Sequence, residues 1–152
     1  MQKDAIQNHI SNTYPGLNKV DAWGETSWFY NPNDAFARGT YFCTLKEKDG
    51  DNDKGSNLDR EGVFRLNTGL PKAEFEKLFG APPSRPAKGG IIEGPWNLQA
   101  LDTIMPHPVY GWMSWVCVLN PSVSTFETFK PLLDHGYAKA VMTFEKKLKA
   151  AR

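Results

Sequence analysis

Four residues of this sequence have side chains that could bind a ligand or take part in chemistry: Trp23, Glu25, His107 and Trp112. His107 lies between two prolines, which restrict the backbone on both sides and favour an extended segment. An imidazole held in this way could act in catalysis or ligate a metal, because its pKa lies near neutral pH. The structural alternative is a turn that precedes a strand. His9 and His135 fall in segments predicted to be terminal helices, and no metal-ligand spacing links them to His107.

Glu25 follows the pair Trp23-Gly24 and could serve as a general acid or base. The sequence places no second carboxylate beside it, so the catalytic residues of any reaction stay unknown. We expect Trp23, Glu25, His107 and Trp112 to line a ligand-binding pocket. An enzyme that uses His107 and Glu25 is one alternative. The sequence contains no serine-nucleophile elbow, phosphate-binding loop or dinucleotide fingerprint, and we expect no cofactor.

The sequence contains 5 tryptophans among 152 residues, which is many for a chain of this length. Burial in the core is expected for most of them, because each indole can bury about 150–250 Å². Aromatic side chains on a sheet can also stack on nucleobases, but such a surface needs lysine and arginine among them. Nearby basic residues are few: Arg38, Arg65, Arg85 and Lys88. We therefore expect a small molecule or a protein as partner, with nucleic acid disfavoured but not excluded.

The polar segment 47–62 resembles part of a calcium-binding loop. Asp49, Asp51 and Asp53 occupy positions 1, 3 and 5 of an EF-hand pattern. Position 6, which requires glycine, is a lysine, and position 12, which requires glutamate, is an arginine. The sequence therefore predicts a solvated, mobile loop and no metal site.

Length and composition are typical of one globular domain that spans residues 1–152. The formal net charge of +1 gives no field that would select nucleic acid or an anionic membrane. The first residues are polar, and no apolar run reaches the roughly 18 residues of a membrane span, so we expect a cytoplasmic protein with no membrane partner. Cys43 and Cys117 lie in apolar, strand-like runs, which favours buried free thiols over a disulfide.

Apolar periodicity predicts the order of the secondary-structure elements. A helix is expected over 3–13 and a short aromatic strand over 26–30. In the next strand, Tyr41, Cys43 and Leu45 should face one way and Phe42 and Thr44 the other. A third strand should place Phe64 and Leu66 inward and Arg65 and Asn67 on the opposite face. A short helix over 70–80 should bury Phe75, Leu78 and Phe79.

The second half of the chain predicts one or two short strands within 91–105 and the strongest strand over 109–119. That strand has apolar residues on both faces, which favours a central position in the sheet. The closing helix should start at a capping box, Ser124 to Glu127, and break or kink at Pro131. These elements predict an α+β fold, with a mainly antiparallel sheet of about five or six strands packed against N-terminal and C-terminal helices.

Several long segments resemble an uncharacterised bacterial family, the domain of unknown function 6194. They are WGETSWFYNP, RGTYFCTLKEKDGDND, SNLDREGVFRLNTGL, FEKLFG, PAKGG and PHPVYGWMSWVCVLNP, spread over about residues 20 to 145. The resemblance implies no activity, cofactor or catalytic residue. It does suggest a bacterial protein. From the candidate pocket residues we expect a non-enzymatic ligand-binding or interaction module.

Trp23-Gly24 and the segment 137–147 are also more distantly similar to MmcQ/YjbR-like proteins. That resemblance implies a frataxin-like fold with a double-wing arrangement known from DNA binding. Iron binding of the frataxin type would need an acidic first helix, and residues 3–13 contain only Asp4. Weak DNA binding stays an alternative function, although the basic residues cluster only at the C-terminal tail: Lys146, Lys147, Lys149 and Arg152.

Overall fold

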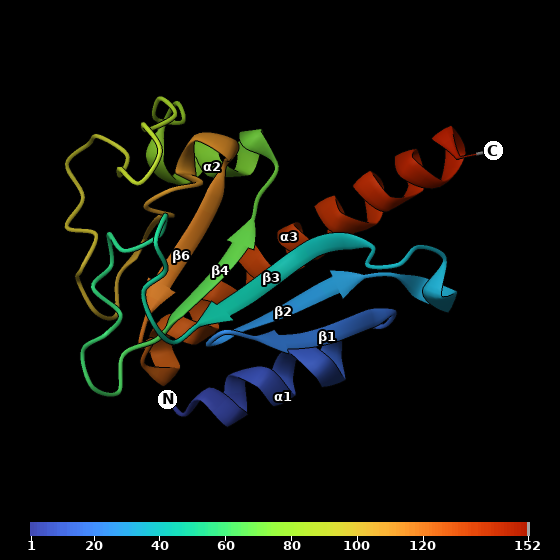
Figure 1. Cartoon of the computed structure of the whole chain (residues 1–152), viewed down its shortest axis with the longest axis horizontal. Coiled ribbons are helices and arrows are strands. Elements are labelled where there is room, and N and C mark those ends of the chain that lie inside the picture. Colours follow the sequence, from blue (N-terminus) through green and yellow to red (C-terminus); the bar gives the residue numbers. More distant parts are fainter. Residues whose placement is uncertain (152) are drawn as a thin grey trace.

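The structure is a computed structural model that describes residues 1–151. One six-stranded sheet has the order β1-β2-β3-β4-β6-β5, and every pair of neighbouring strands is antiparallel. The strands are β1 (Leu17–Ala22), β2 (Glu25–Tyr30), β3 (Thr40–Lys46), β4 (Arg65–Gly69), β5 (Ile104–Pro106) and β6 (Trp115–Leu119). The helices are α1 (Lys3–Thr13), α2 (Lys72–Phe79) and α3 (Val123–Ala150). This architecture, shown in Figure 1, confirms the predicted α+β fold with terminal helices.

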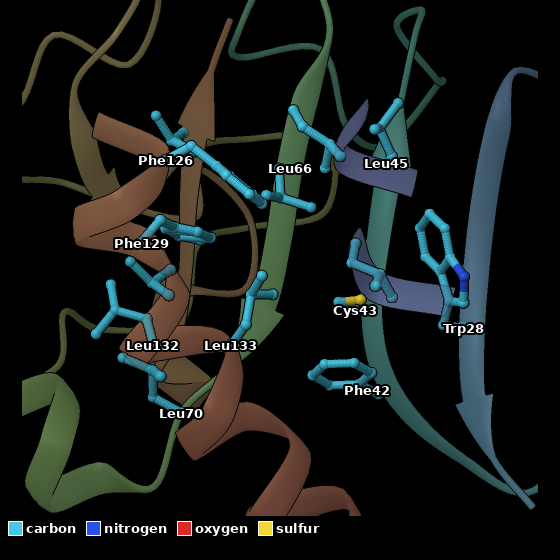
Figure 2. Close-up of a cluster of buried hydrophobic side chains, with 14 of the residues drawn as sticks. Trp28, Phe42, Cys43, Leu45, Leu66, Leu70, Phe126, Phe129, Leu132 and Leu133 are labelled. Atoms are coloured by element: carbon cyan, nitrogen blue, oxygen red, sulfur yellow. The ribbon is translucent and has the colours of Figure 1, made fainter. Parts of the chain in front are cut away.

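The main core lies between one face of the sheet and the helices α1 and α3. Alternate strand residues point to this helix face, which carries Trp28, Cys43, Leu45, Leu66, Val116 and Val118. Phe126, Phe129 and Leu133 of α3 pack against them, as do Ile6 and Ile10 of α1. Figure 2 shows these side chains from helix and strands meeting in one cluster. Residues 3–13 are helical and bury Ile6 and Ile10, as predicted.

Over β5 and β6, the opposite face of the sheet is covered by two long loops, which we call the acidic loop (47–64) and the proline loop (80–103). They form a second, smaller core around Leu58, Ile92, Leu98, Cys117 and Leu119. The loops also contact each other, because the guanidinium of Arg60 donates a hydrogen bond to the carbonyl of Gln99. Side chains on this loop face are therefore enclosed by irregular structure, in the arrangement that commonly produces a binding site.

The strand predicted over 109–119 is shorter in the structure. β6 begins only at Trp115, and residues 111–113 form a single 3₁₀ turn. Two features stop the strand: the side chain of His107 accepts the N–H groups of Val109 and Tyr110, and Ser114 has a φ of 69°. β6 is an inner strand, paired with β4 on one side and with β5 on the other. Of the segment 91–105, only its end is extended, in β5.

The strand β3 departs from strict alternation. A β-bulge shifts the register so that Trp28 pairs with Cys43 and the next residue, Phe29, pairs with Tyr41. Phe42 and Cys43 therefore both face the helix core, while Tyr41 and Thr44 border the same cavity on the loop face. The predicted grouping of Tyr41 with Cys43 was wrong for this reason. Strand β1 was not predicted, because its outer positions are polar and exposed.

The helices also differ from the sequence prediction. α3 is capped by Ser122, whose Oγ accepts the N–H of Thr125, so the cap is not at Ser124. Pro131 does not break the helix, which continues without interruption over 28 residues. The exposed position of Pro131 lets the ring face solvent. In α2, Phe75 is buried but Leu78 is 46 % exposed, so only part of the predicted apolar stripe is covered.

Both cysteines are buried free thiols, as predicted. Cys43 belongs to the helix core and Cys117 to the second core. Within residues 1–151, no helix has the length and apolarity needed to cross a membrane.

Candidate functional site

A cavity of about 310 Å³ opens on the loop face of the sheet. Its lining comes from three strands, the acidic loop and the turn before β6: Glu25, Tyr41, Thr44, Asp53, His107, Tyr110, Met113 and Trp115. The structure thus brings Glu25 and His107, two of the four residues predicted for a ligand pocket, to one cavity. It adds three aromatic rings and a second carboxylate that the sequence analysis had not assigned to a site.

Strand register sets the floor of this cavity. Thr44 of β3 pairs with Asn67 of β4, and Gly69 of β4 pairs with Trp115 of β6. A Cβ atom at Gly69 would lie 2.9 Å from the indole of Trp115, closer than van der Waals contact permits. The missing side chain at Gly69 therefore lets the indole lie across β4 and form a wall of the cavity.

Arg65 lies beneath the cavity and is fully buried. Its Nε donates to Asn67 Oδ1 at 2.7 Å, and its Nη1 donates to Asp53 Oδ1 at 3.0 Å and Ser56 Oγ at 2.8 Å. Nη2 donates to Asp53 Oδ2 at 2.5 Å and lies 3.1 Å from Nε2 of His107. Four of the five guanidinium N–H groups are thus hydrogen-bonded, and the imidazole covers the fifth.

His107 is held by its neighbours on both ring nitrogens. Its Nδ1 accepts the backbone N–H groups of Val109 at 3.1 Å and Tyr110 at 3.0 Å. Because backbone amides only donate, Nδ1 is an acceptor here, while Nε2 faces the Arg65 guanidinium at 3.1 Å and Asp53 Oδ2 at 3.8 Å. Burial and the adjacent positive charge of Arg65 hold the pKa of His107 well below its usual range. The imidazole is therefore neutral at physiological pH.

The two carboxylates of the cavity are in different environments. Asp53 is paired with Arg65, and the hydrogen bonds and charge of that guanidinium outweigh burial and lower its pKa. Burial raises the pKa of Glu25, and the ammonium of Lys46, at 3.9 Å, only partly offsets that effect. Within residues 1–151, no group donates a hydrogen bond to the Glu25 carboxylate. Glu25 is thus an acceptor whose hydrogen-bonding capacity is open to a ligand.

Trp23 and Trp112, the other two residues predicted for the pocket, are not part of its lining. Trp23 is 94 % exposed at the turn between β1 and β2, with a φ of 50°. Trp112 borders two neighbouring grooves, where the guanidinium of Arg85 stacks on its ring at 4.7 Å from the ring centre. Of the five tryptophans only Trp28 is fully buried. The expectation that core packing explains most indoles was therefore wrong.

Part of the acidic loop is buried, whereas its composition predicts a solvated loop. Asp51, Asn52 and Lys54 are exposed, but Asp53 turns inward to Arg65, and Ser56 and Leu58 are buried. Asp49 Oδ1 accepts the N–H of Leu58, and this hydrogen bond joins the start of the acidic loop to its later part. The EF-hand carboxylates therefore point to different partners. Among residues 1–151, no three side chains of His, Cys, Asp or Glu come together as a metal site.

Several cavity residues could not be assigned from the sequence, although a signal for one of them was visible. Arg65 alternates with Phe64 and Leu66 in a predicted strand, and an arginine on the second face of an inner strand requires a buried partner. The identity of that partner, Asp53, depends on how the acidic loop folds back. Tyr110 and Met113 were expected within a strand and instead lie at the rim, in the turn before β6.

Comparison with known proteins gives a family without an assigned activity. A family model described as a family of unknown function, DUF6194, matches residues 1–149. No curated protein and no solved structure matches the chain. The more distant similarity to MmcQ/YjbR-like proteins stays a prediction. Since the match extends over nearly the whole sequence, the chain belongs to the DUF6194 family.

Proposed function

We propose that the protein binds a small organic molecule in the cavity between Glu25 and Trp115. The observation that carries the proposal is the combination of an apolar wall with a carboxylate that accepts no hydrogen bond from the described residues, in one cavity open to solvent. Tyr41, Tyr110 and Met113 border the cavity and are each about half exposed. Half-exposed apolar side chains around one polar group are typical of a preformed ligand site.

The arrangement favours binding over catalysis by His107. A general base needs a free lone pair directed at the substrate proton. In His107, both nitrogens face donors or the Arg65–Asp53 pair, and only 4 % of the side chain is exposed. His107 instead positions the turn that carries Tyr110. An enzymatic reaction in this cavity would have to depend on Glu25.

Weak DNA binding, the other alternative, has less support from the geometry. Lys146, Lys147 and Lys149 are exposed near the end of α3, on a helix that packs against the face opposite the cavity. The ammonium of Lys147 lies 4.5 Å from the ring centre of Phe36, which directs it toward the protein. A gel-shift assay with a DNA duplex at low salt tests this alternative, because phosphate contacts are strongest there.

A thermal-shift screen against a library of small organic metabolites tests the proposed function. A compound that binds the folded state raises the melting temperature by mass action. The variants Tyr110→Ser and Met113→Ser should reduce the shifts, because both side chains line the cavity. Leu101→Ser is the matched control, since Leu101 has the same exposed fraction, 46 %, and lies outside the lining. Shifts that persist in the two cavity variants would place the binding site elsewhere.

A further inference from the structure

We propose that the ligand of this cavity is a small organic cation, with an alkylammonium group seated between Trp115, Tyr41 and Glu25. This inference depends on the proposed function, because it names the chemical class that the same site would bind. It follows from three properties of the cavity: its aromatic walls, the sign of the charges that line it, and the absence of a cationic side chain from its lining.

The aromatic walls are arranged around the opening. Tyr41 and Trp115 meet edge to face, with ring centres 6.3 Å apart and planes at 78°. Tyr110 also lies near His107, whose ring centre is 5.0 Å from that of Tyr110 and 6.3 Å from that of Trp115. The faces of indole and phenol rings attract cations, and cages of such rings bind quaternary ammonium groups. Met113 adds a polarizable thioether to the same wall.

The charges that line the cavity are negative. Glu25 and Asp53 are lining residues, whereas Lys46 and Arg65 are not. These four groups have no net charge together, so selectivity depends on which of them a ligand meets first. A ligand in the cavity meets only the two carboxylates among the charged lining residues, and of these Glu25 is the one without a hydrogen-bond donor, because both Asp53 oxygens accept from Arg65. A cation would also give Glu25 the counter-charge that the 3.9 Å separation from Lys46 does not fully supply.

An anionic ligand would find no cationic donor among the residues that line the cavity. The guanidinium of Arg65 is the strongest anion-binding group nearby, but Asn67, Ser56 and Asp53 occupy four of its N–H groups and His107 covers the fifth. The Nδ1 atom of His107 is likewise occupied by two backbone amides. An anion would therefore lose its hydration shell against two carboxylates without gaining a charged hydrogen bond.

Three probes of similar size separate charge from shape: choline, its neutral isostere 3,3-dimethylbutan-1-ol, and the anion 3,3-dimethylbutanoate. Binding of each is measured by isothermal titration calorimetry at pH 7.5. We expect choline to bind on the order of tenfold more tightly than the neutral isostere, and the anion to bind weakest, because only the cation gains the ring and carboxylate attraction.

Two variants test the residues that carry the inference. Glu25→Gln should reduce choline affinity toward that of the neutral isostere, and Tyr110→Leu should reduce it while keeping the rim apolar. Glu61→Gln is the matched control, because Glu61 is exposed and outside the cavity. Circular dichroism confirms that each variant is folded before its affinity is compared.

The outcomes distinguish this inference from the proposed function. Equal binding of choline and its neutral isostere, or tightest binding of the anion, would overturn the cation assignment and leave a small-molecule site. Absence of choline binding, together with metabolite shifts that Tyr110→Ser abolishes, would also overturn the cation assignment alone. Failure of all probes and of the metabolite screen would overturn both.

Discussion

The carboxylate of Asp53 forms a two-pronged ion pair with the buried guanidinium of Arg65, with N–O distances of 3.0 and 2.5 Å. The pair joins the acidic loop to β4, directly beneath the cavity that Glu25 and His107 line. The Arg65 side chain is 0 % exposed and that of Asp53 is 16 % exposed. Because water does not reach the guanidinium, its positive charge is compensated by the Asp53 carboxylate. The pair therefore controls both the fold of the loop and the shape of the site.

Removal of the Asp53 charge should strongly destabilise the protein. Asp53→Asn leaves the Arg65 guanidinium buried without a counter-ion, a change that typically costs about 3–5 kcal/mol in the free energy of unfolding. Asp51→Asn, at an exposed position of the same loop, should change that free energy by less than about 0.5 kcal/mol. Urea titration followed by circular dichroism measures both. A loss for Asp53→Asn as small as that of the control would show that Arg65 does not depend on this carboxylate.

The neutral state of His107 predicts a specific pH dependence. The folded-state pKa of His107 is lowered, while the unfolded imidazole titrates near 6.5. Below that pH the His107 imidazole binds a proton in the unfolded chain but not in the folded chain. The free energy of unfolding should therefore fall as the pH is lowered from about 6.5. His107→Asn keeps an acceptor near Val109 and Tyr110 and removes the titrating ring. The variant should lose less stability than the wild type between pH 7.5 and pH 5, as measured by thermal unfolding.

The pH dependence of stability that comes from Glu25 should be opposite in sign to that from His107. At neutral pH the ionised Glu25 carboxylate should lower the free energy of unfolding. Its folded-state pKa is raised from 4.5, so the contribution of Glu25 to stability decreases as the pH rises through that raised value. Glu25→Gln should therefore raise the melting temperature at pH 7.5 while it weakens ligand binding. A residue retained for binding at the expense of stability is common in functional sites. If Glu25→Gln lowered the melting temperature, the carboxylate would be a structural group with a partner in the fold.

Both thiols should be unreactive in the folded protein. Burial raises the pKa of Cys117 to about 12, and it raises that of Cys43 well above the ordinary value. Because the thiolate is the reactive form, Ellman's reagent should modify neither cysteine under native conditions and both in urea. Native labelling of one thiol within minutes would show that its face of the sheet opens, with Cys43 reporting on the helix core and Cys117 on the second core.

The fold could be predicted from the sequence where local patterns match burial. The alternation of Phe64, Arg65, Leu66 and Asn67 correctly places Phe64 and Leu66 in the helix core and Arg65 and Asn67 on the opposite face, at the start of β4. The apolar pattern predicted the wrong structure where a side chain, and not a neighbouring strand, accepts the backbone N–H groups. His107 accepts the amides of Val109 and Tyr110, so an apolar run that reads as a continuous strand turns before β6. The β-bulge at Phe42 likewise has no local signal, because both phenylalanine and tyrosine favour strands.

The cavity could be predicted only in part, because contacts between distant segments create it. Glu25 and His107 stood out by residue type and by their neighbours in the sequence. Asp53 was recognised only as a member of a polar loop, and its inward turn depends on Arg65, a partner in β4. Trp23 and Trp112 were selected because they are aromatic. Residue type alone does not distinguish an exposed indole at a hairpin turn from one that lines a cavity.

The most direct test of the binding site uses the five indole N–H groups as reporters in a ¹H–¹⁵N NMR spectrum. Single tryptophan variants assign the resonances, and choline or a compound from the metabolite screen is then titrated. The indole resonance of Trp115 should shift with increasing ligand, while those of Trp28 and Trp96, which lie outside the cavity lining, should not. Shifts confined to Trp112 or Trp96, with Trp115 unchanged, would contradict a ligand site at the Glu25 cavity.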